Sequence, residues 1–233
     1  MRVLITRPEP DASKLAGQLR ALGHTPVLES LLSITYEKGA PAELSGVQAV
    51  LITSANGIRA LAQRTAERAL PVLCVGAASA DAAREEGFTD VRSADGDVHA
   101  LEALAQQRCV PENGPLLHVA GTVVAGDLAG ALTKAGYKVD RQVLYAAQVS
   151  DELTSEARAA LESGGVDAVL LFSPRTAKTF AKLVCDAHLE GACEGLRLLC
   201  LSQAVAAELG ALSGAVLQVA KTPDEAALLE LLT

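Results

Sequence analysis

The sequence predicts an α/β protein of two lobes with parallel sheets and a cleft between the lobes. Short runs rich in valine, isoleucine and leucine alternate along the chain with alanine-rich stretches of helical length. This alternation is typical of strand–helix–strand units, which build a parallel sheet with helices on both faces. Half of the residues are hydrophobic and only 3% are aromatic. A core of alanine, leucine and valine suits helices packed on buried parallel strands.

A further observation, an internal repeat, indicates that there are two lobes. Residues 46–54, GVQAVLITS, resemble residues 165–173, GVDAVLLFS. Residues 73–78 and 199–204 form a second such pair, in the same order and at a similar separation. Chance similarity between two apolar strands is the alternative, but two matches in one order favour a duplicated lobe.

The predicted elements follow from local composition and periodicity. The expected strands are short apolar runs, and in chain order they cover 3–6, 26–29, 49–53, 72–75, 116–119, 143–146, 168–172, 198–201 and 216–219. The expected helices are alanine-rich with apolar residues at helical spacing, and they cover 11–22, 55–66, 79–86, 98–107, 127–135, 175–187, 204–212 and 224–231. Gly23, directly after the first helix, is a typical helix end.

Two more extended stretches, residues 31–36 and 141–149, flank the middle of the chain. If they pair as a ribbon, the N-terminal strand, helix and strand belong with the C-terminal half, and the first lobe is discontinuous. The predicted boundaries are 1–30 and 152–233 for the first lobe, 39–141 for the second lobe, and 31–38 and 142–151 for the connecting segments.

Charge and motifs argue against several classes of function. The formal net charge of −8 disfavours a broad nucleic-acid surface, which needs clustered lysine and arginine. The signature motifs of P-loop NTPases, dinucleotide-binding enzymes and α/β-hydrolases do not occur. The four histidines are scattered and the five cysteines include no CxxC pair, so we expect no metal. Cys74 and Cys200 are expected to be reduced core thiols, with a redox or zinc role as the alternative.

The N-terminal segment MRVLITRP is too short in its apolar part for a signal peptide, and no apolar run of membrane-spanning length follows it. We therefore expect a cytoplasmic protein without a membrane partner.

Small hydroxyl residues stand where several predicted strands end. In open α/β sheets, ligands bind beyond the carboxyl ends of the strands, where helices begin and their free N–H groups attract anions. The hydroxyl residues at these positions are Thr6, Thr53, Ser54, Ser79, Ser173 and Ser202. Each is also a typical helix N-cap, and a cap fixes the N–H groups that a carboxylate would use. Gly121–Gly126 could form a further anion-binding loop.

Several segments, in their order and spacing, resemble one known family, the uroporphyrinogen-III synthases. The segments are Leu4–Pro8, Ile52–Gly57, Val75–Ala80, Leu116–Tyr145, Phe172–Pro174 and Thr222–Pro223, which together span nearly the whole chain. The resemblance implies two flavodoxin-like lobes joined by a two-stranded ladder.

The resemblance also implies a lyase of porphyrin and heme biosynthesis. Such an enzyme converts hydroxymethylbilane, a linear tetrapyrrole rich in carboxylates, into uroporphyrinogen III with loss of water. It closes the ring and inverts the terminal pyrrole, commonly through a spirocyclic intermediate, and it uses no metal or organic cofactor. The implied partners are the linear tetrapyrrole substrate and, transiently, hydroxymethylbilane synthase.

Site residues follow from the same resemblance. Tyr145 corresponds to the tyrosine that the family is thought to use as the acid for the leaving hydroxyl, and a tyrosine that merely ends a strand is the alternative. The substrate-binding candidates are Arg7, Thr53, Ser54, Ser79, Gly121, Thr122, Ser173, Arg175 and Ser202. Two positions depart from the family pattern: Ser202 stands where members commonly carry Gly-Pro-Thr-Thr, and Ala120 stands where many carry arginine.

Two other functions fit parts of the pattern. A non-catalytic, two-lobed binding protein for an anionic small molecule would share the predicted cleft. A transferase that uses a sugar nucleotide would share the two lobes, but such chains are usually much longer. The isomer formed from fresh hydroxymethylbilane would distinguish the synthase from both alternatives.

Overall fold

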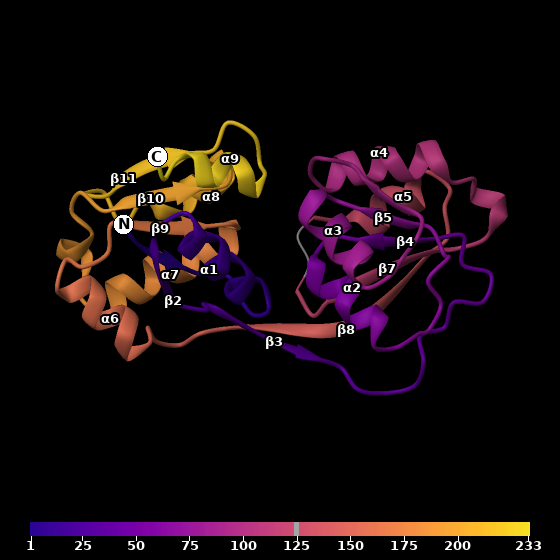
Figure 1. Ribbon diagram of the computed structural model, residues 1–233. Helices are drawn as coiled ribbons and strands as arrows, with labels where there is room; N and C mark the ends of the chain where they lie inside the picture. Colours follow the sequence, from indigo (N-terminus) through magenta and orange to yellow (C-terminus); the bar gives the residue numbers. More distant parts are fainter. Residues whose placement is uncertain (124–125) are drawn as a thin grey trace. The chain divides into compact units, whose positions relative to one another are not determined.

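The computed structural model describes residues 1–123 and 126–233, and the chain divides into two compact units. The first unit comprises Met1–Ser33 and Gln148–Thr233, and the second comprises Ile34–Ala147. Each unit contains a largely parallel sheet with helices packed on it (Figure 1). The predicted α/β class with two parallel sheets is therefore confirmed.

The first unit is built on a five-stranded parallel sheet in the order β11-β10-β9-β1-β2. Its strands are β1 (Arg2–Ile5), β2 (Thr25–Leu28), β9 (Ala168–Leu171), β10 (Arg197–Cys200) and β11 (Val216–Val219). Its helices are α1 (Asp11–Ala21), α6 (Ser155–Glu162), α7 (Pro174–Asp186), α8 (Gln203–Ala206) and α9 (Glu225–Glu230). Val3 and Ile5 pack with α1 and α9, whereas Leu4 packs with α6 and α7. Both faces are buried, which explains the continuous apolar strands.

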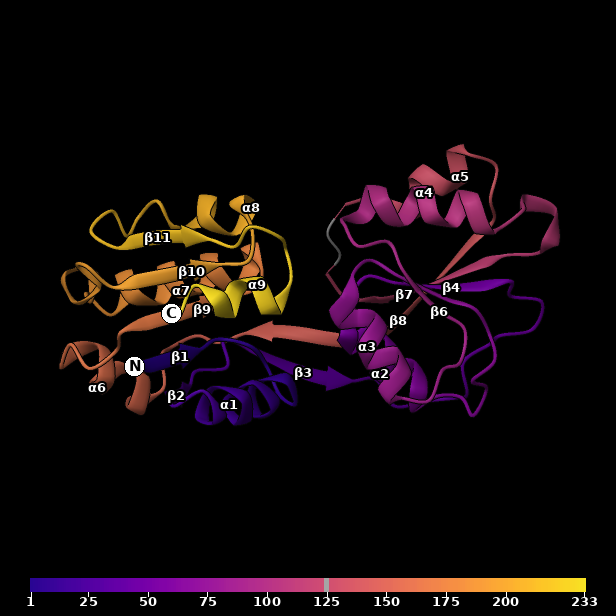
Figure 2. The same cartoon turned by 45° about the horizontal axis from the view of Figure 1, so that its top comes forward.

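The second unit is built on a six-stranded sheet in the order β3-β8-β7-β4-β5-β6. Its strands are β3 (Leu32–Tyr36), β4 (Ala49–Ile52), β5 (Val72–Cys74), β6 (Val91–Ser93), β7 (Leu116–Gly121) and β8 (Val139–Val149). Its helices are α2 (Ala55–Ala62), α3 (Ala77–Glu85), α4 (Val98–Arg108) and α5 (Leu128–Lys134). Helices α2 and α3 cover the face that carries Val50 and Ile52, and α4 and α5 cover the face that carries Leu51 (Figure 2).

The two units have the same spatial order of strands, but the chain forms these strands in a different sequence in each unit. The order β2-β1-β9-β10-β11 of the first unit matches the order β8-β7-β4-β5-β6 of the second. The repeated sequences map β9 on β4 and β10 on β5. The pair β1–β2 precedes these strands in the first unit, whereas its counterpart β7–β8 follows them in the second. The two units are thus related by a circular permutation of strand order.

Four elements differ from the sequence-based expectation. The helix expected over 55–66 ends at Ala62, after which Arg64 turns to donate to the carbonyl of Glu37 at 3.0 Å. The helix expected over 204–212 is α8 followed by a short 3-10 turn, Ala207–Leu209. Strand β6 and helix α6 were not predicted. Strand β6 has only three residues, too few to show the alternation of a strand. Helix α6 buries Ala157, Ala160 and Leu161 at helical spacing, so its pattern was present in the sequence but was missed.

The two extended stretches pair with each other. Strands β3 and β8 are neighbours in the sheet. The N–H of Glu37 donates to the carbonyl of Leu144 at 2.8 Å, and the N–H of Ser150 donates to the carbonyl of Leu31 at 3.0 Å. Because residue numbers rise along one strand as they fall along the other, the pair is antiparallel. The boundaries between the two units fall within these stretches. The first unit ends after Ser33 and resumes at Gln148, and the residues between them belong to the second unit.

Candidate functional site

Each sheet has one switch point, where strand connections leave in opposite directions and a ligand crevice is expected. In the second unit it lies between β4 and β7, because β4 continues to β5 on one side while β7 lies on the other. In the first unit it lies between β1 and β9, because β1 continues to β2 on the opposite side. The carboxyl ends of these strands carry most of the predicted site residues.

Tyr145 lies in the second unit beside the end of β7, and only 7% of it is exposed. A bulge shifts the pairing of β7 and β8, so that Ala120 pairs with Val143 but Gly121 pairs with Tyr145. The N–H of Thr122 donates to the carbonyl of Tyr145 at 3.1 Å. The structure therefore brings together Tyr145, Gly121 and Thr122, three residues that the sequence analysis named separately. Residues 124 and 125 of the expected anion-binding loop lie outside the described residues.

The neighbouring strand ends of the second unit carry the next three candidates. Thr53 and Ser54 follow β4, and the Oγ of Ser54 caps α2 by accepting from the N–H of Asn56 at 3.2 Å. Ser79 is buried in the first turn of α3, the helix that follows β5. These helix starts point N–H groups toward the carboxyl edge of the sheet, as anion binding requires.

At the switch point of the first unit, Thr6 and Arg7 are both engaged in contacts within the fold. The fully buried Thr6 hydroxyl donates to the carbonyl of Leu170 at 2.7 Å. The Arg7 guanidinium lies 3.3 Å from the Asp11 carboxylate and 2.5 Å from the Glu225 carboxylate. Its central carbon lies 4.5 Å from the centre of the Phe172 ring. A substrate carboxylate on Arg7 would therefore have to compete with Asp11 or Glu225.

Ser173, Arg175 and Ser202 lie at two further strand ends of the first unit. The Oγ of Ser173 caps α7, which follows β9, by accepting from the N–H of Thr176 at 3.1 Å. Arg175 is half-buried in the first turn of the same helix. Ser202 precedes α8 but makes no side-chain capping bond. Ser173 thus has a defined cap geometry, whereas Ser202 does not.

The capping serines lead to a prediction of modest effects. One helix N-terminus contributes about 0.3–1 kcal/mol to anion binding, so we expect Ser54→Ala and Ser173→Ala each to raise KM by roughly two- to fivefold. Loss of the cap should also lower the free energy of unfolding by about 0.5–2 kcal/mol. Steady-state kinetics and urea denaturation measure the two effects.

The matched control is Ser163→Ala, which removes a hydroxyl that donates to the carbonyl of Ala160 at the opposite end of the first unit's sheet. It should leave KM unchanged. Complete loss of activity in either capping variant, with the fold intact, would instead identify a nucleophile.

Other titratable side chains are poor candidates for the acid. Burial, and to a lesser extent Arg141, lowers the pKa of His118 to about 4, so this 3% exposed ring is neutral near pH 7. Burial raises the pKa of Cys74 to about 12 and that of Cys200 to about 11. Both thiols are 0% exposed and are weaker acids than a phenol of pKa about 10, so neither is suited to donate a proton to a substrate. Among the described residues, no three histidine, cysteine, aspartate or glutamate side chains gather into a metal-binding cluster.

Two cavities, of about 240 and 430 Å³, lie beside β6 and α4, and Tyr145 and Ser54 line neither of them.

Within the described ranges, no helix combines the length and the apolar character that a membrane crossing requires.

Sequence reasoning assigned no role to two residues of this site, Asn56 and Gly57. The Oδ1 of Asn56 is buried and has no hydrogen-bond partner among the described residues. Gly57 lies within α2 directly opposite the carbonyl of Val119 and the Tyr145 ring. A glycine inside a predicted helix is the signal that could have found this contact, because it often marks a close approach of the backbone.

Comparison with known proteins gives one family and several structures. The family model described as uroporphyrinogen-III synthase HemD matches residues 13–230. None of the curated proteins matches the chain. Among solved structures, uroporphyrinogen-III synthetase from Helicobacter pylori aligns with a TM-score of 0.64 at 17% identity, covering 100% of this chain and 98% of that chain. A mutant uroporphyrinogen III synthase from the extremely thermophilic bacterium Thermus thermophilus aligns with a TM-score of 0.56 at 19% identity, covering 100% and 97%.

Proposed function

The chain belongs to the uroporphyrinogen-III synthase family, and from this premise we propose how its own residues carry out the reaction. The protein is a lyase of tetrapyrrole biosynthesis that cyclises hydroxymethylbilane to uroporphyrinogen III, with inversion of the terminal pyrrole ring and loss of water. We assign Tyr145 as the acid and the strand-end N–H groups as the carboxylate-binding groups.

The leaving hydroxyl defines what the acid must do. The adjacent pyrrole can expel this hydroxyl because its nitrogen lone pair stabilises the cation that remains. Tyr145 donates its proton as the carbon–oxygen bond breaks, so that the hydroxyl leaves as water. The substituted α-carbon of the terminal pyrrole attacks the cation and gives a spirocyclic intermediate, in which that carbon carries two methylene bridges. The older of these two bonds breaks and leaves a cation on the neighbouring pyrrole, which the free α-carbon of the terminal ring attacks, so that this ring is inverted. The proton lost from that α-carbon restores the phenol. A phenol with a pKa of about 10 is protonated at neutral pH and suits this step.

The position of Tyr145 is the observation that carries the assignment. It lies at the carboxyl end of β7, next to the switch point, with its carbonyl bonded to the N–H of Thr122. Among the other titratable groups described above, His118 is unprotonated near pH 7, and Cys74 and Cys200 are fully buried weak acids. Among the candidates at the strand ends of the second unit, Tyr145 alone carries an acid matched to the reaction.

Carboxylate binding is assigned to many weak donors rather than to a few cations. The protein carries a formal net charge of −8, so a substrate rich in carboxylates needs local compensation. Three helix N-termini offer N–H groups at the strand ends. Ser54 caps α2, Ser173 caps α7, and Ser79 lies in the first turn of α3. Thr53, Thr122, Arg175 and Ser202 complete the proposed set, and Arg7 joins it only if a substrate carboxylate displaces an acidic partner.

Two further parts of the proposal concern the cell. Hydroxymethylbilane closes without catalysis to the type I isomer, so transient contact with hydroxymethylbilane synthase would shorten its exposure to water. The cytoplasm is the proposed location, and the five free cysteines fit a reducing compartment.

The test of the function is the isomer that the protein forms. Purified protein is incubated with freshly made hydroxymethylbilane, the product is oxidised, and the porphyrin isomers are separated. We expect mainly the type III isomer, with type I in the controls that contain no protein or heat-denatured protein. A type I product identical to these controls would refute the enzymatic function, and binding without type III formation would favour the non-catalytic binding protein.

A further inference from the structure

The bulge between β7 and β8 places two consecutive residues of β8 in the core. Leu144 and Tyr145 are both buried and both pack in the cluster under α2 and α3. In a regular strand, successive side chains point to opposite faces of the sheet. A bulge inserts one extra residue and re-aims the side chain that follows it, and bulges are frequent beside active sites. Here the register shift between Ala120 and Gly121 turns Tyr145 toward the face that carries α2.

Gly121 lies directly against the Tyr145 ring. A Cβ at position 121 would lie 2.9 Å from Cε2 and Cζ of Tyr145 and 3.2 Å from its hydroxyl oxygen. Carbon atoms in contact are normally about 3.5–4.0 Å apart, so any side chain at this position would displace the ring. The backbone conformation of Gly121 does not itself require glycine, because its φ is not in the left-handed region. The glycine is required by the tyrosine.

Gly57 lies on the opposite edge of the same ring. A Cβ at position 57 would lie 3.7 Å from Cε1 of Tyr145 and 3.3 Å from the carbonyl oxygen of Val119. The first contact is ordinary packing, and the second is tight. Gly57 therefore lets α2 approach β7 closely enough to place its backbone beside the tyrosine.

We propose that Gly57 and Gly121 form a slot that positions the Tyr145 hydroxyl for proton donation, and that Gly121 is a positioning residue rather than a substrate ligand. The inference rests on the proposed role of Tyr145 in the reaction. It replaces the interpretation of Gly121 as a donor to substrate, because the close contact with the ring by itself accounts for a glycine at this position. Gly57, to which sequence reasoning gave no role, becomes the second wall of the slot.

The test is a double-mutant cycle of Gly121→Ala and Tyr145→Phe, with kcat, KM and Tm measured for all four proteins. Because a displacement of about 1 Å can cost up to about a hundredfold in rate, we expect Gly121→Ala alone to lower kcat by about tenfold with little change in KM. In the Tyr145→Phe background it should lower kcat by less than about twofold, since no hydroxyl remains to be misplaced. The Phe ring still occupies the slot, so Tm should fall by a similar amount in both backgrounds.

A second readout examines the slot without catalysis. The chain has three tyrosines, so selectively labelled rings can be assigned by tyrosine-to-phenylalanine variants. Gly121→Ala should shift the ring resonances of Tyr145 and leave those of Tyr137 unchanged. Gly17→Ala is the matched control, because a Cβ at that position meets no atom within 4 Å, and it should change neither the kinetics nor the spectrum of Tyr145.

Three results would overturn the inference. A higher KM with unchanged kcat in Gly121→Ala would make the glycine a substrate contact. An equal loss of kcat in both backgrounds would show that Gly121 acts independently of the hydroxyl. Full turnover in Tyr145→Phe, combined with shifted ring resonances in Gly121→Ala, would leave a packing slot without a catalytic purpose. The wild-type isomer assay tests the proposed function separately from all three.

Discussion

Replacement of Tyr145 by phenylalanine is expected to lower kcat by roughly tenfold to a few hundredfold while KM changes little. Phenylalanine keeps the ring in its slot against Gly57 and Gly121 and removes only the proton donor. General acid catalysis typically contributes about 10²–10⁴-fold. The pyrrolic hydroxyl is already a good leaving group, so we expect the lower part of that range. The residual product should remain the type III isomer, since the conformer of the substrate is held by other groups.

The remaining tyrosines provide the controls. The hydroxyl of Tyr137 donates to the carbonyl of Cys109 at 2.9 Å, so Tyr137→Phe should cost about 0.5–1.5 kcal/mol of stability and leave kcat unchanged. Tyr36→Phe, on β3, should likewise leave turnover near that of the wild type. Full turnover of Tyr145→Phe would mean that Tyr145 only packs within the fold and that positioning of the substrate carries the catalysis.

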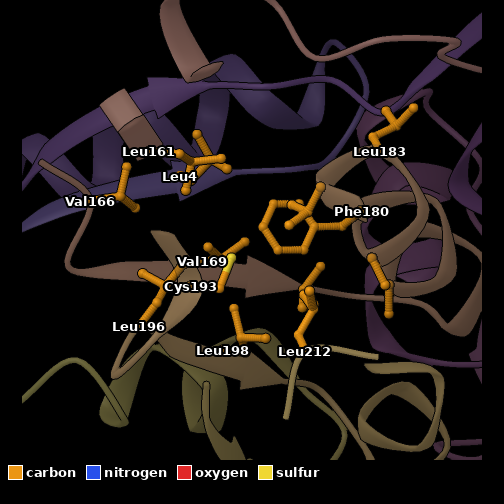
Figure 3. Close-up of a cluster of buried hydrophobic side chains, with 14 of the residues drawn as sticks. Leu4, Leu161, Val166, Val169, Phe180, Leu183, Cys193, Leu196, Leu198 and Leu212 are labelled. Carbon is orange, nitrogen blue, oxygen red and sulfur yellow. The ribbon is translucent and has the colours of Figure 1, made fainter. Parts of the chain in front are cut away.

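The largest expected effect on stability is that of Phe180→Ala, which should lower the free energy of unfolding by about 3–5 kcal/mol. Phe180 is 0% exposed and lies on α7 among residues from several elements, including Leu4, Val169 and Leu212 (Figure 3). A loss of this size is a large part of the roughly 5–15 kcal/mol that stabilises a typical protein. Because α7 also carries Ser173 at its N-terminus, KM should rise in any protein that remains folded.

Urea denaturation followed by circular dichroism measures this effect. The matched control is Leu22→Ala, which removes a side chain of similar character that is 59% exposed and should change stability by less than about 0.5 kcal/mol. If the two units unfold separately, Phe180→Ala should shift only the transition of the first unit. A loss below about 1 kcal/mol would contradict the packing around Phe180.

The strands and the helix caps were the features most accessible from the sequence. The strands β4 and β9 are buried on both faces and therefore appear as uninterrupted apolar runs, AVLI and AVLL. Ser54 and Ser173 bond to N–H groups only two or three residues away, so their capping depends on local sequence alone. By contrast, β6 has three residues with Arg92 at its centre, and nothing in so short a segment distinguishes it from a loop.

The roles of individual site residues were less accessible. Arg7 was expected to bind substrate, and that role stays a prediction, but its partner Glu225 lies 218 residues away in the chain. No local sequence pattern predicts this ion pair, because it forms only when α9 packs beside β1 and α1. Gly121 was expected to bind substrate as well, and only the pairing of β7 with β8 showed the Tyr145 ring against it.

The sequence by itself determined the α/β class, most of the strands, the capping serines and the resemblance to the family, because each depends on residues close together or on ordered motifs. The tertiary structure alone decided the strand permutation between the units, the acidic partners of Arg7 and the slot around Tyr145. These features depend on strand order and on a one-residue register shift at Ala120 and Gly121. Register is set by the packing of whole sheets against helices, and a shift of one residue changes the face on which every later side chain lies.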